Sequence, residues 1–150
     1  MATVQFATPT DLDNVYIYKN GANKIALKQR KVRLVFVLGG DTHVVANGDV
    51  LSIAAPEAFT LEEIKASVVS ASVSQITFGV TVGAVNIMTT PVTIDGNELH
   101  TATAAVPNVI DPTKKNVAED AVIAVTVSNQ GDGAATGAVV YLLGYVSQPT

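Results

Sequence analysis

The hydrophobic pattern of this chain is that of short β-strands from about Asp49 onward. Apolar and β-branched residues form short runs, and clusters of Gly, Asn, Asp, Ser and Pro separate them. Strands with turn signals at intervals of roughly 8–12 residues are typical of a β-sandwich or a β-barrel. The predicted strands are Val50–Ala54, Ile64–Val69, Ile76–Val82, Val92–Ile94, Ala121–Val127 and Ala138–Val146.

One segment, residues 59–69, allows two interpretations. Thr60 followed by Glu63 fits a helix capping box, which would start a short helix. The serines and valines at 67–70 favour a strand instead, and the flanking pattern is all β. We therefore expect a strand in this segment.

The first 45 residues are expected to form a separate part of the molecule. Residues 15–18 and 25–27 predict a hairpin, because the Asn20-Gly21 pair between them accepts the positive φ angles of a tight turn. Val32–Leu38 predicts a strand with apolar residues on both faces, which indicates burial in the core or against a neighbouring subunit. We expect residues 1–45 to be an anchoring or oligomerisation arm with a hairpin, and residues 46–150 to form the sandwich.

Composition limits the classes of protein that fit. The chain has 150 residues and is 48% hydrophobic, which suits one domain with a real core. It has no cysteine, which excludes disulfides and cysteine-ligated zinc. The N-terminus has no basic segment followed by an apolar run, and no stretch reaches the roughly 20 apolar residues of a membrane helix. We expect a product of the cytoplasm with no membrane partner.

The charge is divided unevenly along the chain. Residues 1–33 hold six basic and two acidic residues, for a net charge of +4, whereas residues 34–150 hold three against eleven, for −8. A basic segment beside an acidic body indicates contact with an acidic partner surface. The alternative is a strand edge that lysines protect against aggregation. The candidate partner-binding residues are Lys24, Lys28, Arg30, Lys31 and Arg33.

The residues that could perform acid–base chemistry are few and scattered. The two histidines, His43 and His100, have no metal-ligand motif around them, so we expect them on the surface or in turns. Glu62 and Glu63 are adjacent, so in a regular strand their side chains would point to opposite faces. We expect no catalytic residue and no enzymatic activity.

The motifs that could bind calcium, phosphate or nucleic acid are incomplete. Residues 11–14 resemble the opening of a calcium loop but lack the Gly and Glu that complete an EF-hand. The glycines from Gly131 to Gly137 lack the Lys-Ser/Thr pair of a phosphate loop, so we expect a connection between strands. No Gly-x-Ser-x-Gly motif occurs. The basic stretch lacks interleaved aromatics, and the chain is acidic overall. We therefore expect no metal, no cofactor and no nucleic acid.

The part of the chain from Phe59 to Val146 resembles a β-sandwich module of tailed-bacteriophage virion proteins. The resemblance covers roughly the last two-thirds of the chain and is a pattern of strands and turns without a diagnostic catalytic residue. The matching segments are Phe59–Val68, Ile76–Val82, Thr90–Glu98, Thr101–Pro107, Val109–Asp111, Ala118–Val127, Gly133–Gly137 and Val140–Tyr145.

The resemblance implies an all-β fold, a jelly-roll-like β-sandwich with a short N-terminal arm and hairpin. Members of this group are capsid decoration proteins, head fibres and tail appendages. The chain has no repeats or heptads for a fibre shaft, so it is most similar to a decoration, or cement, protein. That implies a homotrimer on the capsid surface, made in the host cytoplasm, that binds across neighbouring subunits of the major capsid protein shell.

Two other functions remain as alternatives. A head-fibre or tail-associated module that binds a receptor or carbohydrate would present aromatic side chains in loops. Here Tyr16, Tyr18, Tyr141 and Tyr145 fall in predicted strands, which disfavours that function. A hydrolase is disfavoured because the residues supply no acid–base constellation.

Overall fold

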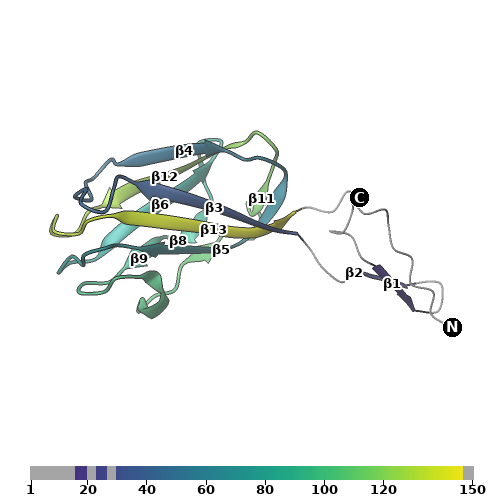
Figure 1. The fold of residues 1–150 in the computed structure, drawn as a ribbon, viewed down its shortest axis with the longest axis horizontal. Coiled ribbons are helices and arrows are strands. Elements are labelled where there is room, and N and C mark those ends of the chain that lie inside the picture. The colour runs from purple at the N-terminus through teal and green to yellow at the C-terminus, as the bar shows by residue number, and fades with distance from the viewer. Residues whose placement is uncertain (1–15, 20–22, 27–29, 147–150) are drawn as a thin grey trace. The chain divides into compact units, whose positions relative to one another are not determined.

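The computed structural model describes residues 16–19, 23–26 and 30–146, in two compact units that divide between Lys31 and Val32. In the first unit, β1 (Tyr16–Lys19) pairs antiparallel with β2 (Asn23–Ala26), which confirms the predicted hairpin. The second unit is an all-β sandwich, as predicted (Figure 1). Among the described residues, the only helical element is a single 3₁₀ turn, η1 (Thr101–Thr103).

Two sheets make the sandwich. The first has the strand order β11-β5-β13-β3, and the second has the order β4-β12-β6-β7, with β9 also paired to β6. β8 and β10 pair with each other outside these sheets. The bounds are β3 (Lys31–Leu38), β4 (Val50–Ala54), β5 (Phe59–Ser67), β6 (Ile76–Val82), β7 (Val85–Asn86), β8 (Met88–Thr90), β9 (Val92–Ile94), β10 (Val109–Ile110), β11 (Asn116–Val117), β12 (Val122–Asn129) and β13 (Ala138–Val146).

The core lies between the two sheets and follows from strand alternation. In β13, every second residue from Ala138 to Gly144 is buried, and β6 buries Ile76, Phe78 and Val80 in the same way. Phe36, Phe59 and Phe78 are fully buried, one each from β3, β5 and β6. Burial of a side chain of this size contributes about 1.5–3 kcal/mol to folding. These three aromatic rings therefore join both sheets in one core.

The segment with two interpretations is a strand, β5, so the strand prediction is confirmed and the helix is wrong. The prediction that Glu62 and Glu63 point to opposite faces is also wrong, because both side chains are exposed. The pairing of β5 with β13 shifts at this point: Leu143 opposes Glu63 and Gly144 opposes Leu61, so Glu62 is an extra, unpaired residue. A β-bulge of this kind restores the inward direction of the apolar side chains on both sides of it.

β3 is confirmed as a strand, but it is buried on one face only. Val32, Phe36 and Leu38 are buried in the core, whereas Val35 and Val37 on the other face are 40% and 51% exposed. The predicted burial of both faces inside the chain is therefore wrong, and burial against a neighbouring subunit stays a prediction. Because β3 pairs with β13, it belongs to the sandwich. The boundary between units accordingly precedes the expected one at 45/46.

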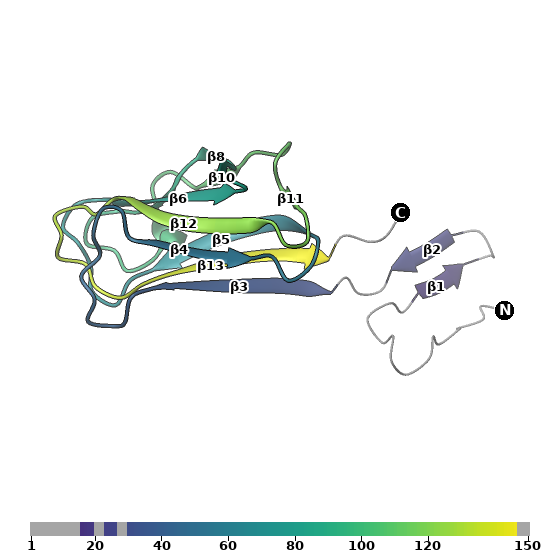
Figure 2. The same ribbon diagram turned by 90° about the horizontal axis from the view of Figure 1, so that it is seen from above.

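The edges of the first sheet differ in how they are covered. The outer edge of β5 is closed by β11 and by the segment that follows β9: Asn108 Nδ2 donates to the Ile64 carbonyl at 2.8 Å, and Val68 N donates to the Leu99 carbonyl at 2.9 Å. β3, at the other edge, has only β13 as a strand neighbour among the described residues, and Figure 2 shows it as the outermost strand on its side of the sandwich. We call the side with β9 and β11 the closed side, because short strands and loops lie along the longer strands there, and the side with β3 and β4 the open side.

Candidate interaction surface

The five basic residues predicted to bind a partner are distributed over both units. Lys24 lies on β2 and pairs with Tyr18, and Lys28 lies outside the described residues. Arg30 is exposed just before β3, where it has an interaction partner. Lys31 and Arg33 are alternate, exposed residues of β3, so the strand brings them to one face. Of the predicted set, these two are the ones that the structure places on one strand.

Arg33 lies over an aromatic ring of the neighbouring strand. Its guanidinium carbon is 4.8 Å from the centroid of the Tyr141 ring on β13. A cation–π contact at an exposed site contributes roughly 0.5–1 kcal/mol and orients the guanidinium. Val35 and Val37 follow on the same face of β3. We define the β3 surface as Lys31, Arg33, Val35, Val37 and Tyr141, a surface with cations at one end and apolar side chains at the other.

The apolar end of the β3 surface opens into a hollow of about 190 Å³ where β3 ends and β4 begins. The hollow lies next to the loop that joins the two sheets. Its walls are mostly aliphatic, and His43 and Asp49 supply its ionisable groups. The lining residues are Val37, Leu38, Gly39, His43, Asp49, Val50 and Leu51.

His43 and Asp49 form a hydrogen-bonded pair in this hollow. His43 Nε2 is 2.8 Å from Asp49 Oδ2, which also accepts a 2.9 Å hydrogen bond from Ala46 N. The Ala46 bond first, and then His43, hold the pKa of Asp49 below its ordinary value, although partial burial acts in the opposite direction. The Asn47-Gly48-Asp49 turn makes the pair possible, because Gly48 has a φ of +89°.

The sequence predicted the exposure of His43 but not its hydrogen bond to Asp49. His43 is exposed, as expected, but its carboxylate partner was not predicted, although the turn at residues 47–49 was a signal that the chain returns toward it. No residue that lines the hollow carries a hydroxyl or a thiol. The pair links two parts of the loop between β3 and β4.

His100 lies on the closed side of the sandwich. It is exposed and makes an isolated bridge with Ser67 at the end of β5. The two histidines therefore belong to different segments, which agrees with the expectation that they are surface residues.

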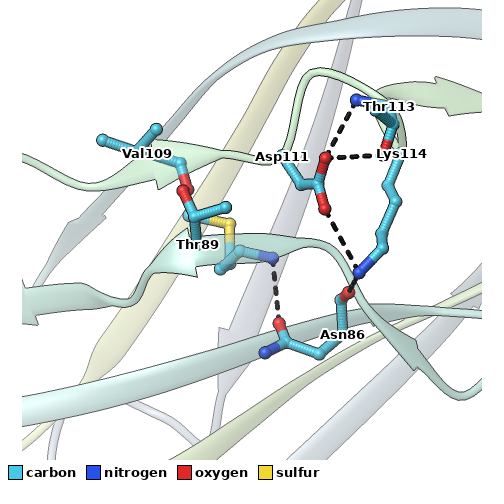
Figure 3. Close-up of polar contacts among 7 residues, drawn as sticks. Asn86, Thr89, Val109, Asp111, Thr113 and Lys114 are labelled. Carbon is cyan, nitrogen blue, oxygen red and sulfur yellow. Dashed lines mark hydrogen bonds and ion pairs between the residues drawn. The ribbon is translucent and has the colours of Figure 1, made fainter.

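A second polar cluster, in Figure 3, joins the segment around β10 to β7 and β8. Asp111 accepts two hydrogen bonds from Thr113, which together with Lys114 lower its pKa. Lys114 Nζ is 3.2 Å from Asp111 Oδ2 and donates to the Asn86 carbonyl at 3.1 Å. Thr89 donates to the Val109 carbonyl at 3.2 Å. The hydrogen bonds of Lys114 and Thr89 join residues of different segments, so the cluster connects loops.

The described part of the chain contains no group of three or more His, Asp or Glu side chains that could hold a metal ion. Within the same residues, no helix has the length and hydropathy needed to cross a membrane. Tyr16, Tyr18, Tyr141 and Tyr145 lie in β1 and β13, so their prediction as strand residues is confirmed.

No family model and no curated protein matches this chain. The conclusions about function that follow therefore depend on the sandwich and its surfaces.

Proposed function

We propose that this chain is a structural protein of a phage virion that decorates the capsid and stabilises it by binding across neighbouring subunits of the shell. The observation that supports the proposal most directly is the β3 surface, where cationic and exposed apolar side chains lie together at the open edge of a sandwich. The resemblance of residues 59–146 to virion sandwich modules supports the same class. In this proposal the protein has no enzymatic role.

The mechanism is stabilisation by linked binding. A protein that binds the assembled shell and not its dissociated subunits shifts the equilibrium toward assembly. Many copies on a regular lattice add avidity, so contacts that are modest in each copy hold together as a set. The cations of the β3 surface meet acidic groups of the shell, and the valines bury against its apolar side chains.

The test is sedimentation of the protein with capsids of the phage that encodes it, prepared without the protein. In the variant Lys31→Glu/Arg33→Glu, we expect release from particles at a lower salt concentration than the wild-type protein needs, because charge pairs at an interface weaken with salt. Lys114→Glu/Lys115→Glu is the matched control, since it reverses two lysines with exposed or half-exposed side chains just before β11, at the far edge of the same sheet. Release equal to that of the control, or no binding of the wild-type protein, contradicts the proposal.

A further inference from the structure

In the part of the chain that the structure describes, the outer backbone edge of β3 has no strand paired to it. In the first sheet, the β5 edge is covered by β11, Asn108 and the Leu99 carbonyl, whereas β3 has no described strand on its outer side. An open edge presents a row of unpaired N–H and C=O groups to any extended chain. Proteins that avoid such pairing place charges or proline along the strand. β3 has charges only in its first half, and Val35 and Val37 leave its second half unprotected.

Some core residues on this side are also only partly covered. Leu34 on β3, and Leu51 and Ile53 on β4, face the core but are only partly buried. On the closed side, Val92 and Ile94 of β9 are fully buried. β4 is likewise the edge strand of the second sheet, with β12 as its one described neighbour. A strand added beside β3 would cover apolar surface that the chain itself leaves partly exposed.

The side chains of β3 indicate which kind of strand fits. Residues directly across a ladder lie side by side, so like charges there destabilise and opposite charges stabilise. The complement of Lys31 and Arg33 is a pair of acidic residues, and the complement of Val35 and Val37 is a pair of β-branched apolar residues. The hollow beside Val37 has room for one more apolar side chain.

We propose that an extended segment of a partner protein, acidic at one end and apolar at the other, adds to the β3 edge as a fifth strand of the first sheet. Main-chain hydrogen bonds supply affinity, and alternate side chains supply specificity. This inference rests on the proposed function, because it names the way in which the sandwich holds the shell. It also makes a prediction that needs no virion.

The experiment titrates the full-length protein with capped peptides of the length of β3, which has eight residues. In these peptides Thr occupies every second position, and the positions between hold two Glu followed by two Val. A second peptide has the same residues in reverse order, because a strand can pair with β3 in either direction. One control peptide carries Lys in place of Glu, and another carries Pro at the two central positions. We expect the Glu peptide, in one direction, to bind about tenfold more tightly than the Lys peptide. The Pro peptide should not bind.

Two protein variants test the location. Val37→Lys adds a charge to the free half of β3, and Val122→Lys adds the same charge to β12; both valines are 51% exposed. We expect Val37→Lys to abolish peptide binding and Val122→Lys to keep it. Circular dichroism of both variants checks that they fold alike. Amide hydrogen exchange should show new protection in β3 with the Glu peptide.

The outcomes separate this inference from the proposed function. No binding in either direction, equal binding of the Lys peptide, or protection confined to another strand overturns the edge assignment. Self-association that Val37→Lys removes, without a preference for the Glu peptide, assigns the edge to a second copy and also overturns it. Peptide binding without attachment to capsids overturns the proposed function alone. Attachment to capsids without peptide binding overturns the edge assignment alone.

Discussion

At the scale of single residues, the bulge in β5 depends on a glycine in the neighbouring strand. Gly144 opposes Leu61 at the shifted register. A Cβ atom on Gly144 would lie 2.3 Å from the Thr60 carbonyl oxygen and 2.9 Å from Phe59 Cδ2. Such contacts are too short for any side chain. Gly144 therefore permits the close approach of β13 that the extra residue at Glu62 requires.

Gly144→Ala is expected to destabilise the protein, because the added methyl group forces β13 away from β5. Overpacking of this kind typically costs about 1–3 kcal/mol. Gly79→Ala is the matched control, since Gly79 also lies inside a strand but the nearest atom to its Cβ position, the Thr126 oxygen, is 4.0 Å away. Urea unfolding measures the free energy of unfolding of both variants. Equal stability of the two variants would contradict the role given to Gly144.

At the scale of elements, aspartates join loops that are distant in the sequence. Buried Ser72 donates to Asp132 Oδ1 at 2.6 Å, and the same carboxylate accepts hydrogen bonds from Val73 N and Ala134 N. The Ser72 bond, followed by the backbone bonds, lowers the pKa of Asp132. The carboxylate thus holds the turn after β12 against the loop before β6.

These hydrogen bonds of Asp132, which we call the Asp132 tie, should make the free energy of unfolding depend on pH in the acid range. Because the folded state lowers the pKa of Asp132, its contribution is complete above the unfolded value of about 3.9 and is lost as the pH falls through the lower folded value. Asp132→Asn and Ser72→Ala should therefore unfold more easily at pH 7 and lose less additional stability between pH 5 and pH 2.

The measurement is urea unfolding at a series of pH values. Ser52→Ala, at an exposed serine of β4, is the control and should keep the wild-type dependence on pH. A pH dependence of Asp132→Asn as steep as that of the wild-type protein would contradict the tie.

The sequence predicted the bounds of several strands but not how the strands pair. The pattern of apolar and β-branched runs between turn residues predicted β4, β6, β9 and β13 with the bounds that the structure has. It did not predict the bulge at Glu62, which changes the alternation within one strand. It also could not place β13 between β5 and β3, since that pairing joins segments far apart in the sequence.

For the candidate site too, the sequence predicted residues within one segment but not their partners from other segments. The uneven charge along the chain predicted Lys31 and Arg33 as binding residues. It did not predict Tyr141 next to Arg33 or Asp49 next to His43, because these partners come from other segments. The free edge of β3 depends on the sheet order, which a local pattern does not contain.

At the scale of the whole sandwich, the two sides differ in how their strand edges are covered. On one side, β9, β11 and the segment with η1 cover the strand edges. On the other, β3 and β4 are edge strands, the core is partly exposed, and the hollow with His43 and Asp49 lies where they meet. A protein that closes one side and leaves the other open is suited to be a module that becomes complete when it binds.

The measurement that tests this account most directly is amide hydrogen exchange of the full-length chain, free and bound to capsids. We predict that binding slows exchange in β3 and in the loop of residues 39–49, while β7, β9 and β11 exchange as in the free protein. Protection confined to β7, β9 and β11, or no change in any strand, would contradict it.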